Sequence, residues 1–180
     1  MRLHQEDFAQ ALGIPASDKY ELPGAHHLQD MFALLRRVSE NPIEDQLRLW
    51  DILIFDFLIG NSDNHLKNYS LLYSPDLRSI RLAPAYDIVS TCVYQKSTRE
   101  MAFRIGDARM LDDITRHSFS LASSEAGLGS ALALKRFDRM AELFPSALEK
   151  AAGQLVYSGY PEAEDLKKMI QLHGGCSHTL

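Results

Sequence analysis

The sequence has 180 residues, of which 46% are hydrophobic and 24% charged, so it is long enough to bury a core without disulfides or a structural metal. Its net charge of −5 gives no support to broad nucleic-acid binding, and its longest apolar run, 52–60, is interrupted by Asp56 and is too short to span a membrane. Two distant cysteines and an N-terminus without a signal-peptide pattern favour a cytoplasmic protein.

Helices are expected in the first third of the chain. Short apolar patterns predict one helix over 5–12 and, after a loop, a second over 26–39. A third, over 42–58, has the clearest signals, because Asn41 can cap it and Pro42 suits its first turn. This third helix is apolar on most faces, which is typical of a buried central helix.

The rest of the chain predicts one hairpin followed mainly by helices. Short strands at 69–73 and 79–82 flank a turn and predict a β-hairpin, and a further strand is expected at 101–105. Four helices are then expected, over 112–124, 131–143, 146–157 and 161–173. This order predicts a predominantly helical α+β fold, which we expect to form a single domain over 1–180.

A polar segment follows the apolar helix directly, and residues 60–68 read Gly-Asn-Ser-Asp-Asn-His-Leu-Lys-Asn. Polar groups that leave a core helix must be solvated or paired, and loops on rigid scaffolds often carry catalytic groups. Asp63 and Asn68 have the spacing of the catalytic aspartate and the magnesium-binding asparagine of protein kinases. In such kinases a second magnesium-binding aspartate follows a short hairpin, as Asp87 does here.

This pattern predicts a phosphotransfer site. Asn68, Asp87 and the phosphates of ATP would supply the oxygen ligands that Mg²⁺ prefers, and Asp63 would accept the proton of a hydroxyl group. Lys67 would place positive charge near the γ-phosphate, and His65 either holds the loop or faces the phosphates. Spacing alone leaves an equally good interpretation, a polar loop whose side chains only cap turns.

The sequence also resembles a known family. Residues 60–68 resemble the catalytic loop of HipA-type kinases, and 82–90 resemble their metal-binding segment. Further resemblance to this family lies at 2–8 with 10–13, at 101–106 and at 114–117. The resemblance extends from residue 2 to about residue 125, and the helical tail is compatible with it.

The resemblance implies a serine/threonine kinase of a bacterial toxin–antitoxin module, with the fold of the C-terminal lobe of a protein kinase and a hairpin after its catalytic loop. By motif, Asp63 matches the catalytic base, Asn68 and Asp87 match the magnesium ligands, and His65 and Lys67 match the nucleotide-proximal pair. In the best-known members the protein substrate is an aminoacyl-tRNA synthetase, and a DNA-binding antitoxin restrains the kinase. Direct contact with nucleic acid or membrane is not expected.

This chain differs from complete family members in one respect. Complete members have an N-terminal lobe with an ATP-contacting lysine, and this chain begins just after the place where the hinge between the lobes would lie. We therefore expect the chain alone to bind ATP poorly and to be weak or inert unless another chain supplies that lobe. The alternative function is thus an inert, truncated kinase lobe that acts as a binding or regulatory module.

Two other chemistries fit part of the polar segment. Asn61, Asp63, His65 and Asn68 contain residue types found in metal nucleases, although such sites usually lie on a hairpin that precedes a helix, the reverse of the order here. A phosphotransferase that acts on a small-molecule hydroxyl shares the spacing of Asp63 and Asn68. The resemblance of 82–90 favours the HipA type.

Overall fold

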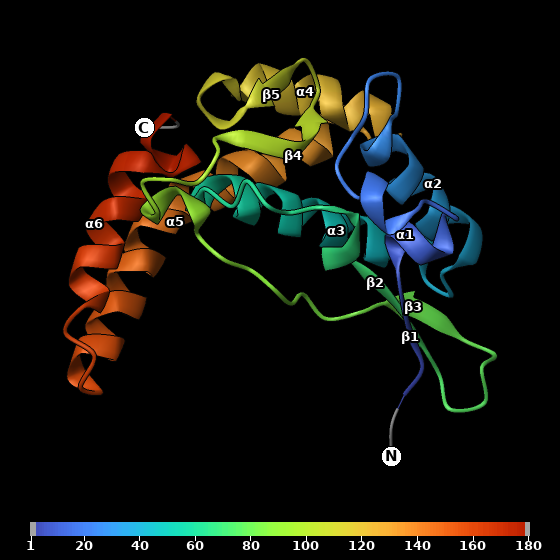
Figure 1. Cartoon of the computed structure of the whole chain (residues 1–180), viewed down its shortest axis with the longest axis horizontal. Helices are drawn as coiled ribbons and strands as arrows, with labels where there is room; N and C mark the ends of the chain where they lie inside the picture. Colours follow the sequence, from blue (N-terminus) through green and yellow to red (C-terminus); the bar gives the residue numbers. More distant parts are fainter. Residues whose placement is uncertain (1–2, 179–180) are drawn as a thin grey trace.

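A computed structural model describes residues 3–178, as a mixed fold of helices and two small antiparallel sheets (Figure 1). The helices are α1 (Phe8–Ala11), α2 (His27–Val38), α3 (Pro42–Ile59), α4 (Arg116–Glu125), α5 (Ser130–Tyr157) and α6 (Ala163–His173). The strands are β1 (Gln5–Asp7), β2 (Ser70–Tyr73), β3 (Ile80–Leu82), β4 (Glu100–Ile105) and β5 (Ala108–Met110). This content confirms the predominantly helical α+β prediction. Within residues 3–178, no helix has the length and apolar character needed to cross a membrane.

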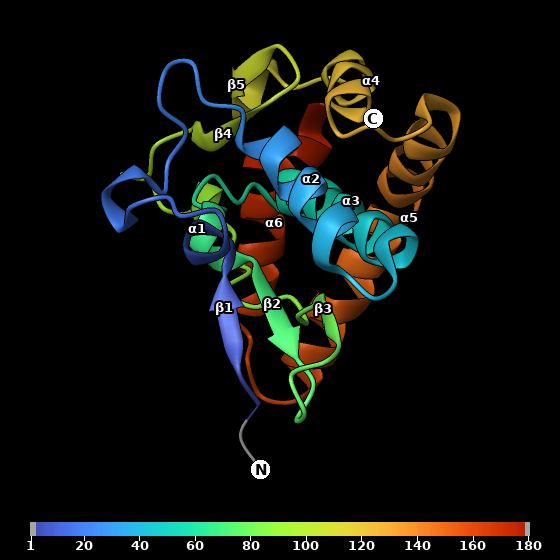
Figure 2. The ribbon, with the colours of Figure 1, turned by 90° about the vertical axis from the view of Figure 1, so that its right-hand side faces the viewer.

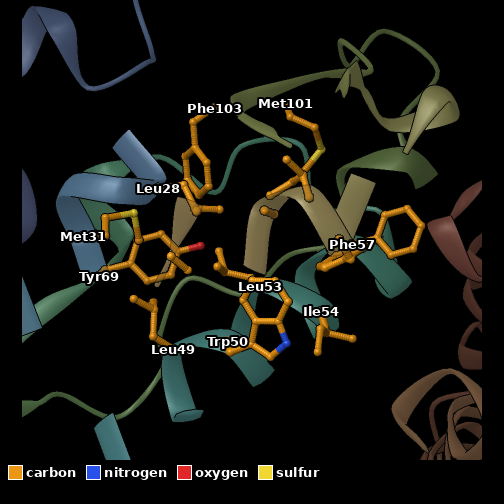
Figure 3. Close-up of a cluster of buried hydrophobic side chains, with 14 of the residues drawn as sticks. Leu28, Met31, Leu49, Trp50, Leu53, Ile54, Phe57, Tyr69, Met101 and Phe103 are labelled. Carbon is orange, nitrogen blue, oxygen red and sulfur yellow. The ribbon is translucent and has the colours of Figure 1, made fainter. Parts of the chain in front are cut away.

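Helix α3 is the buried centre of the molecule, as its sequence predicted. The Asn41 side chain accepts a hydrogen bond from the Glu44 backbone at 3.4 Å, and Pro42 occupies the first turn. Trp50 is fully buried, and its indole nitrogen donates to the Ala133 backbone oxygen of α5 at 3.1 Å. Figure 3 shows side chains of α3 packed against α2, β4 and the segment after the polar loop 60–68, among them Leu28, Met31, Leu53, Phe57, Tyr69 and Phe103.

The first sheet corrects the prediction for residues 5–12. Strand β1 pairs antiparallel with β2, with Gln5 opposite Leu72, and β2 pairs with β3, which confirms the predicted hairpin. Asp7 ends the strand and caps α1, whose Gln10 backbone nitrogen donates to the Asp7 carboxylate at 2.9 Å. The predicted helix is therefore a strand over its first three residues, because pairing with a distant strand outweighs the local pattern. Arg2, in the N-terminal family segment, lies outside the described residues.

The second sheet consists of β4 and β5, which Figure 2 places away from the first sheet and near α4. Strand β4 confirms the predicted strand at 101–105, and β5 was not predicted. The backbone nitrogen of Ala102 in β4 donates to the backbone oxygen of Ser62 at 3.0 Å. This sheet therefore contacts the polar loop that follows α3.

The C-terminal helices differ from the prediction in their boundaries. Helix α5 runs without a break through Pro145, where two helices were expected. Proline removes one backbone donor, but α5 packs against α3, α4 and α6, and tertiary packing of this kind contributes most of a helix's stability. Helix α4 begins at Arg116, after a cap from Thr115, and α6 begins at Ala163, so the predicted starts at 112 and 161 were too early.

Candidate functional site

A sharp turn separates α3 from the polar loop 60–68. Gly60 ends the helix with a φ of 74°, in the left-handed region that favours glycine. A Cβ at this position would lie 2.5 Å from the Cys92 sulfur atom, so a larger residue would also clash. The Asn61 backbone nitrogen donates to the Asp56 backbone oxygen at 2.8 Å. The chain therefore leaves the core at a fixed point and in a fixed direction.

The buried Asp56 side chain holds both ends of the loop. Its carboxylate accepts hydrogen bonds from the Asn61 side chain at 2.9 Å and from the Tyr69 hydroxyl at 3.1 Å. Burial raises the pKa of Asp56 to about 6, and the two hydrogen bonds act in the opposite direction. Sequence reasoning treated Asp56 only as an interruption of an apolar run, although a carboxylate on a buried helix face must find partners.

The middle of the loop is fixed by the segment that follows Asp87. The Ser62 backbone nitrogen donates to the Thr91 hydroxyl oxygen at 2.8 Å, and that hydroxyl donates to the Gly60 backbone oxygen at 3.0 Å. The Ser62 hydroxyl donates to the Thr98 backbone oxygen at 2.8 Å. These contacts hold the backbone on the N-terminal side of Asp63, and nothing in the sequence pattern identified Thr91.

The structure brings Asp63 and Asn68 together, as their spacing suggested. The Asn68 side-chain nitrogen donates to the Asp63 backbone oxygen at 2.9 Å. The Asp63 side chain is exposed, and its Oδ1 atom accepts a hydrogen bond from the Tyr20 hydroxyl at 2.7 Å. This bond, with burial and the nearby Asp63 charge, raises the pKa of Tyr20 to about 12. Sequence reasoning placed Tyr20 in an unassigned loop.

His65 is buried within the loop and faces Lys19. The Lys19 ammonium nitrogen lies 2.7 Å from His65 Nε2, and the Tyr20 ring packs edge-on against the His65 ring at 5.4 Å. Burial lowers the pKa of His65, and the positive charge of Lys19 lowers it further. The negative charges of Asp63 and Asp87 act on His65 in the opposite direction, so these two carboxylates lie in the same electrostatic neighbourhood.

Lys67 and Asp87 are linked through Tyr86. The Tyr86 hydroxyl donates to the Lys67 backbone oxygen at 2.7 Å and therefore accepts from the buried Ser70 hydroxyl, 2.6 Å away. The Lys67 side chain is half-buried. Asp87 follows Tyr86 directly, is exposed, and has a φ of 55°, which is uncommon for a residue other than glycine. The metal-binding candidate Asp87 is thus held to the loop that carries Asn68.

Asn68 and Asp87 fit the chemistry of a magnesium site that is completed by a nucleotide. Both present oxygen ligands, and Mg²⁺ commonly binds one or two protein side chains together with substrate phosphates. Within residues 3–178, no cluster of three or more histidine, cysteine, aspartate or glutamate side chains could hold a metal by itself.

A pocket of about 190 Å³ lies beside Asp63. Its lining side chains come from the loop, from the segment near Tyr20 and from the second sheet: Tyr20, Ser62, Asp63, Thr98, Glu100, Met101 and Arg109. Within this lining, Arg109 pairs with Glu100 at 2.7 Å. The carboxylate predicted to act as a base thus borders this pocket.

Comparisons with known proteins identify relatives of this chain. The model of the HipA-like C-terminal domain family matches residues 1–148. A Sinorhizobium fredii protein named "Putative kinase Y4mE" is 40% identical over 149 residues, which cover 83% of this chain and 35% of that protein. The "Serine/threonine-protein kinase toxin HipA" of Shewanella oneidensis is 29% identical over 161 residues, which cover 82% of this chain and 36% of that protein.

A solved structure shares the fold. A chain in the Shewanella oneidensis complex of HipA, HipB and operator DNA superposes with a TM-score of 0.82 at 24% identity, and the match covers 99% of this chain and 44% of that chain. The two sequence matches described above cover 35% and 36% of those relatives, so the chain spans about a third of their length. Because the family model matches most of its residues, the chain belongs to the family of HipA-like C-terminal domains.

Proposed function

We propose that this chain forms the catalytic lobe of a serine/threonine protein kinase, which transfers the γ-phosphate of ATP to a protein hydroxyl. One observation carries the proposal: Asn68 donates a hydrogen bond to Asp63 at 2.9 Å, while Tyr86, next to Asp87, donates to Lys67 at 2.7 Å. Hydrogen bonds thus tie Asn68 to the candidate base and tie the residue before Asp87 to the same loop. The kinase names of the relatives and the shared fold support the same function.

Each side chain has a defined task in this proposal. Asp63 accepts the proton of the acceptor hydroxyl as its oxygen attacks the γ-phosphorus. The side-chain oxygens of Asn68 and Asp87 hold Mg²⁺, which neutralises charge on the phosphates when bound. Lys67 adds positive charge near the transferred group, and Lys19 holds His65 within the loop. The lobe of a protein-kinase-like fold would present all of these groups on one face.

We also propose that this lobe works with further protein segments. The matched segments cover only 35% and 36% of the two relatives, so the contacts to the α- and β-phosphates and to adenine would come from a second lobe, in the same or another chain. The complex of HipA with HipB and operator DNA supports a DNA-binding antitoxin as a partner. The protein substrate would be a cytoplasmic protein such as an aminoacyl-tRNA synthetase.

A transfer assay tests the proposal. The chain, mixed with the separately produced N-terminal part of a longer relative, is incubated with Mg²⁺, γ-³²P-labelled ATP and a mixture of serine- and threonine-containing proteins. Binding of Mg²⁺·ATP by the same mixture is measured by calorimetry. Asp63→Asn should abolish transfer but retain binding, whereas Asp87→Asn should weaken binding. Asp107→Asn is the matched control, because Asp107 is an exposed carboxylate in the β4–β5 turn.

The outcomes separate the two functions. Transfer that depends on Asp63 supports the kinase. Binding of Mg²⁺·ATP without transfer would favour the alternative, an inert lobe that acts as a binding or regulatory module. Mg²⁺·ATP binding that is insensitive to Asp87→Asn would contradict the proposed site itself.

A further inference from the structure

Residues 19–21 lie against the catalytic loop although they are distant from it in sequence. The backbone nitrogen of Leu66 donates to the Lys19 backbone oxygen at 3.4 Å, and the Glu21 backbone nitrogen donates to the Ala102 backbone oxygen of β4 at 2.8 Å. The Glu21 side chain is buried and accepts hydrogen bonds from the backbone nitrogens of His27 and Arg104, both at 3.1 Å. The residue next to Tyr20 is therefore firmly anchored.

The Tyr20 ring is held on two sides. It packs edge-on against the His65 ring at 5.4 Å, and the Lys19 ammonium lies 4.9 Å above its centre. The same ammonium contacts His65 Nε2 at 2.7 Å, so Lys19 joins the two rings. The Tyr20 side chain is 41% exposed, but its anchored neighbour and these two contacts restrict its ring. The direction of the Tyr20 hydroxyl is thus set before any substrate binds.

That hydroxyl contacts one oxygen of the candidate base. It donates to Asp63 Oδ1 at 2.7 Å, and within residues 3–178 no side chain or backbone group donates to Asp63 Oδ2. Tyr20 and Asp63 both line the pocket of about 190 Å³ described above. The hydrogen bond to Asp63 raises the pKa of Tyr20 to about 12, so the hydroxyl keeps the proton that it donates to Asp63.

We infer that Tyr20 is a positioning residue for phosphotransfer, whose hydroxyl holds Oδ1 of Asp63 and leaves Oδ2 for the acceptor hydroxyl in the adjoining pocket. The inference rests on the proposed function of Asp63. In the step, the acceptor oxygen bonds to the γ-phosphorus and its proton passes to Asp63 Oδ2. The bond from the γ-phosphorus to the bridging oxygen of ATP breaks, which releases ADP, and Tyr20 keeps its own proton throughout.

The variant Tyr20→Phe tests this inference because it removes the hydroxyl and retains the ring that packs on His65. Tyr160→Phe is the control, since Tyr160 is an exposed tyrosine before α6 and far from the loop in sequence. We expect Tyr20→Phe to lower kcat about ten- to a hundredfold, the scale of a misplaced catalytic group, with KM for ATP and for the acceptor changed less than about twofold. An unchanged kcat, or a change in KM alone, overturns the inference.

A second measurement does not require activity. Three-bond couplings between the α and β protons of Asp63, measured by NMR, report the rotamer of its side chain. We expect one rotamer in the parent chain and in Tyr160→Phe, and averaged couplings in Tyr20→Phe. Couplings unchanged by Tyr20→Phe overturn the inference, even where transfer depends on Asp63. If the parent chain transfers no phosphate, the proposed function fails for the chain alone, and the couplings still decide whether Tyr20 positions Asp63.

Discussion

The Asn68 side chain donates a hydrogen bond to the Asp63 backbone oxygen at 2.9 Å, so its amide nitrogen tethers the loop, and in the proposed function its oxygen atom binds the metal. Asn68→Asp should keep the oxygen ligand but lose the tether, whereas Asn68→Ala should lose both. We expect Asn68→Ala to cost about 1 kcal/mol of stability and to abolish Mg²⁺-dependent ATP binding, with binding retained in Asn68→Asp. Urea unfolding and calorimetry measure these effects. Equal ATP binding by Asn68→Ala and the parent would contradict the assignment of Asn68.

The Tyr86 hydroxyl bridges Ser70 and Lys67 and holds the segment that carries Asp87. Tyr86→Phe should cost about 1–2 kcal/mol of stability, because it leaves the buried Ser70 hydroxyl without this partner. It should also weaken Mg²⁺·ATP binding about tenfold, or ~1.4 kcal/mol, by loosening Asp87. Thermal unfolding and calorimetry test both effects, and Tyr94→Phe, at a ring that is mostly exposed, is the control. The same loss in the control would show that the bridge is not responsible.

The Asp56 carboxyl links stability to pH. Its pKa in the folded protein is raised from 3.8 to about 6, so the folded state binds this proton more tightly than the unfolded state does. The resulting stabilisation is complete below pH 3.8 and is lost as the pH rises through about 6. Asp56→Asn removes this titration. The stability of the parent relative to this variant should therefore fall by up to about 3 kcal/mol from about pH 4 to pH 7.

Urea unfolding of both proteins across this pH range measures the difference. Other groups that titrate here, such as His27 and His65, are present in both proteins and largely cancel. A difference that stays constant with pH would show that burial does not raise the pKa of Asp56.

Gly60 should not tolerate a residue with a Cβ atom. Gly60→Ala places a methyl group close to the Cys92 sulfur in a backbone conformation that alanine disfavours, so it should cost at least about 2 kcal/mol. Gly153→Ala is the matched control, because Gly153 lies within α5 with nothing within 4 Å of the added carbon. That change should stabilise the protein by about 0.5–1 kcal/mol. Thermal unfolding distinguishes the two, and similar melting temperatures would refute the steric argument.

The elements predicted best are those whose signals are local. Helix α3 has a cap, a first-turn proline and a terminal glycine within one segment, and the hairpin that follows has a clear turn, so both were predicted within one or two residues. The proximity of Asp63 and Asn68 likewise follows from their short spacing in one loop.

The features that the sequence did not predict depend on contacts between residues far apart in the chain. Strand β1 forms because β2 offers it a partner, and α5 continues through Pro145 because three other helices pack against it. The contacts of Tyr20 and Thr91 with the loop involve side chains far away in sequence, and no periodicity marks them. Asp56 was visible in the sequence, but its role required knowledge of which polar groups lie beside it in the core.

The pairing of β1 with β2 has a consequence for how the site assembles. The Tyr73 hydroxyl contacts the Glu6 carboxylate across a sequence separation of 67 residues, and the polar loop 60–68 lies within the stretch of chain that this contact closes. Closing so long a stretch carries an entropic cost that must be met before the pairing stabilises the structure. Helix α3 and its hairpin can form from nearby residues, so β1 should add late in folding, and the complete loop environment should appear only in the final stage.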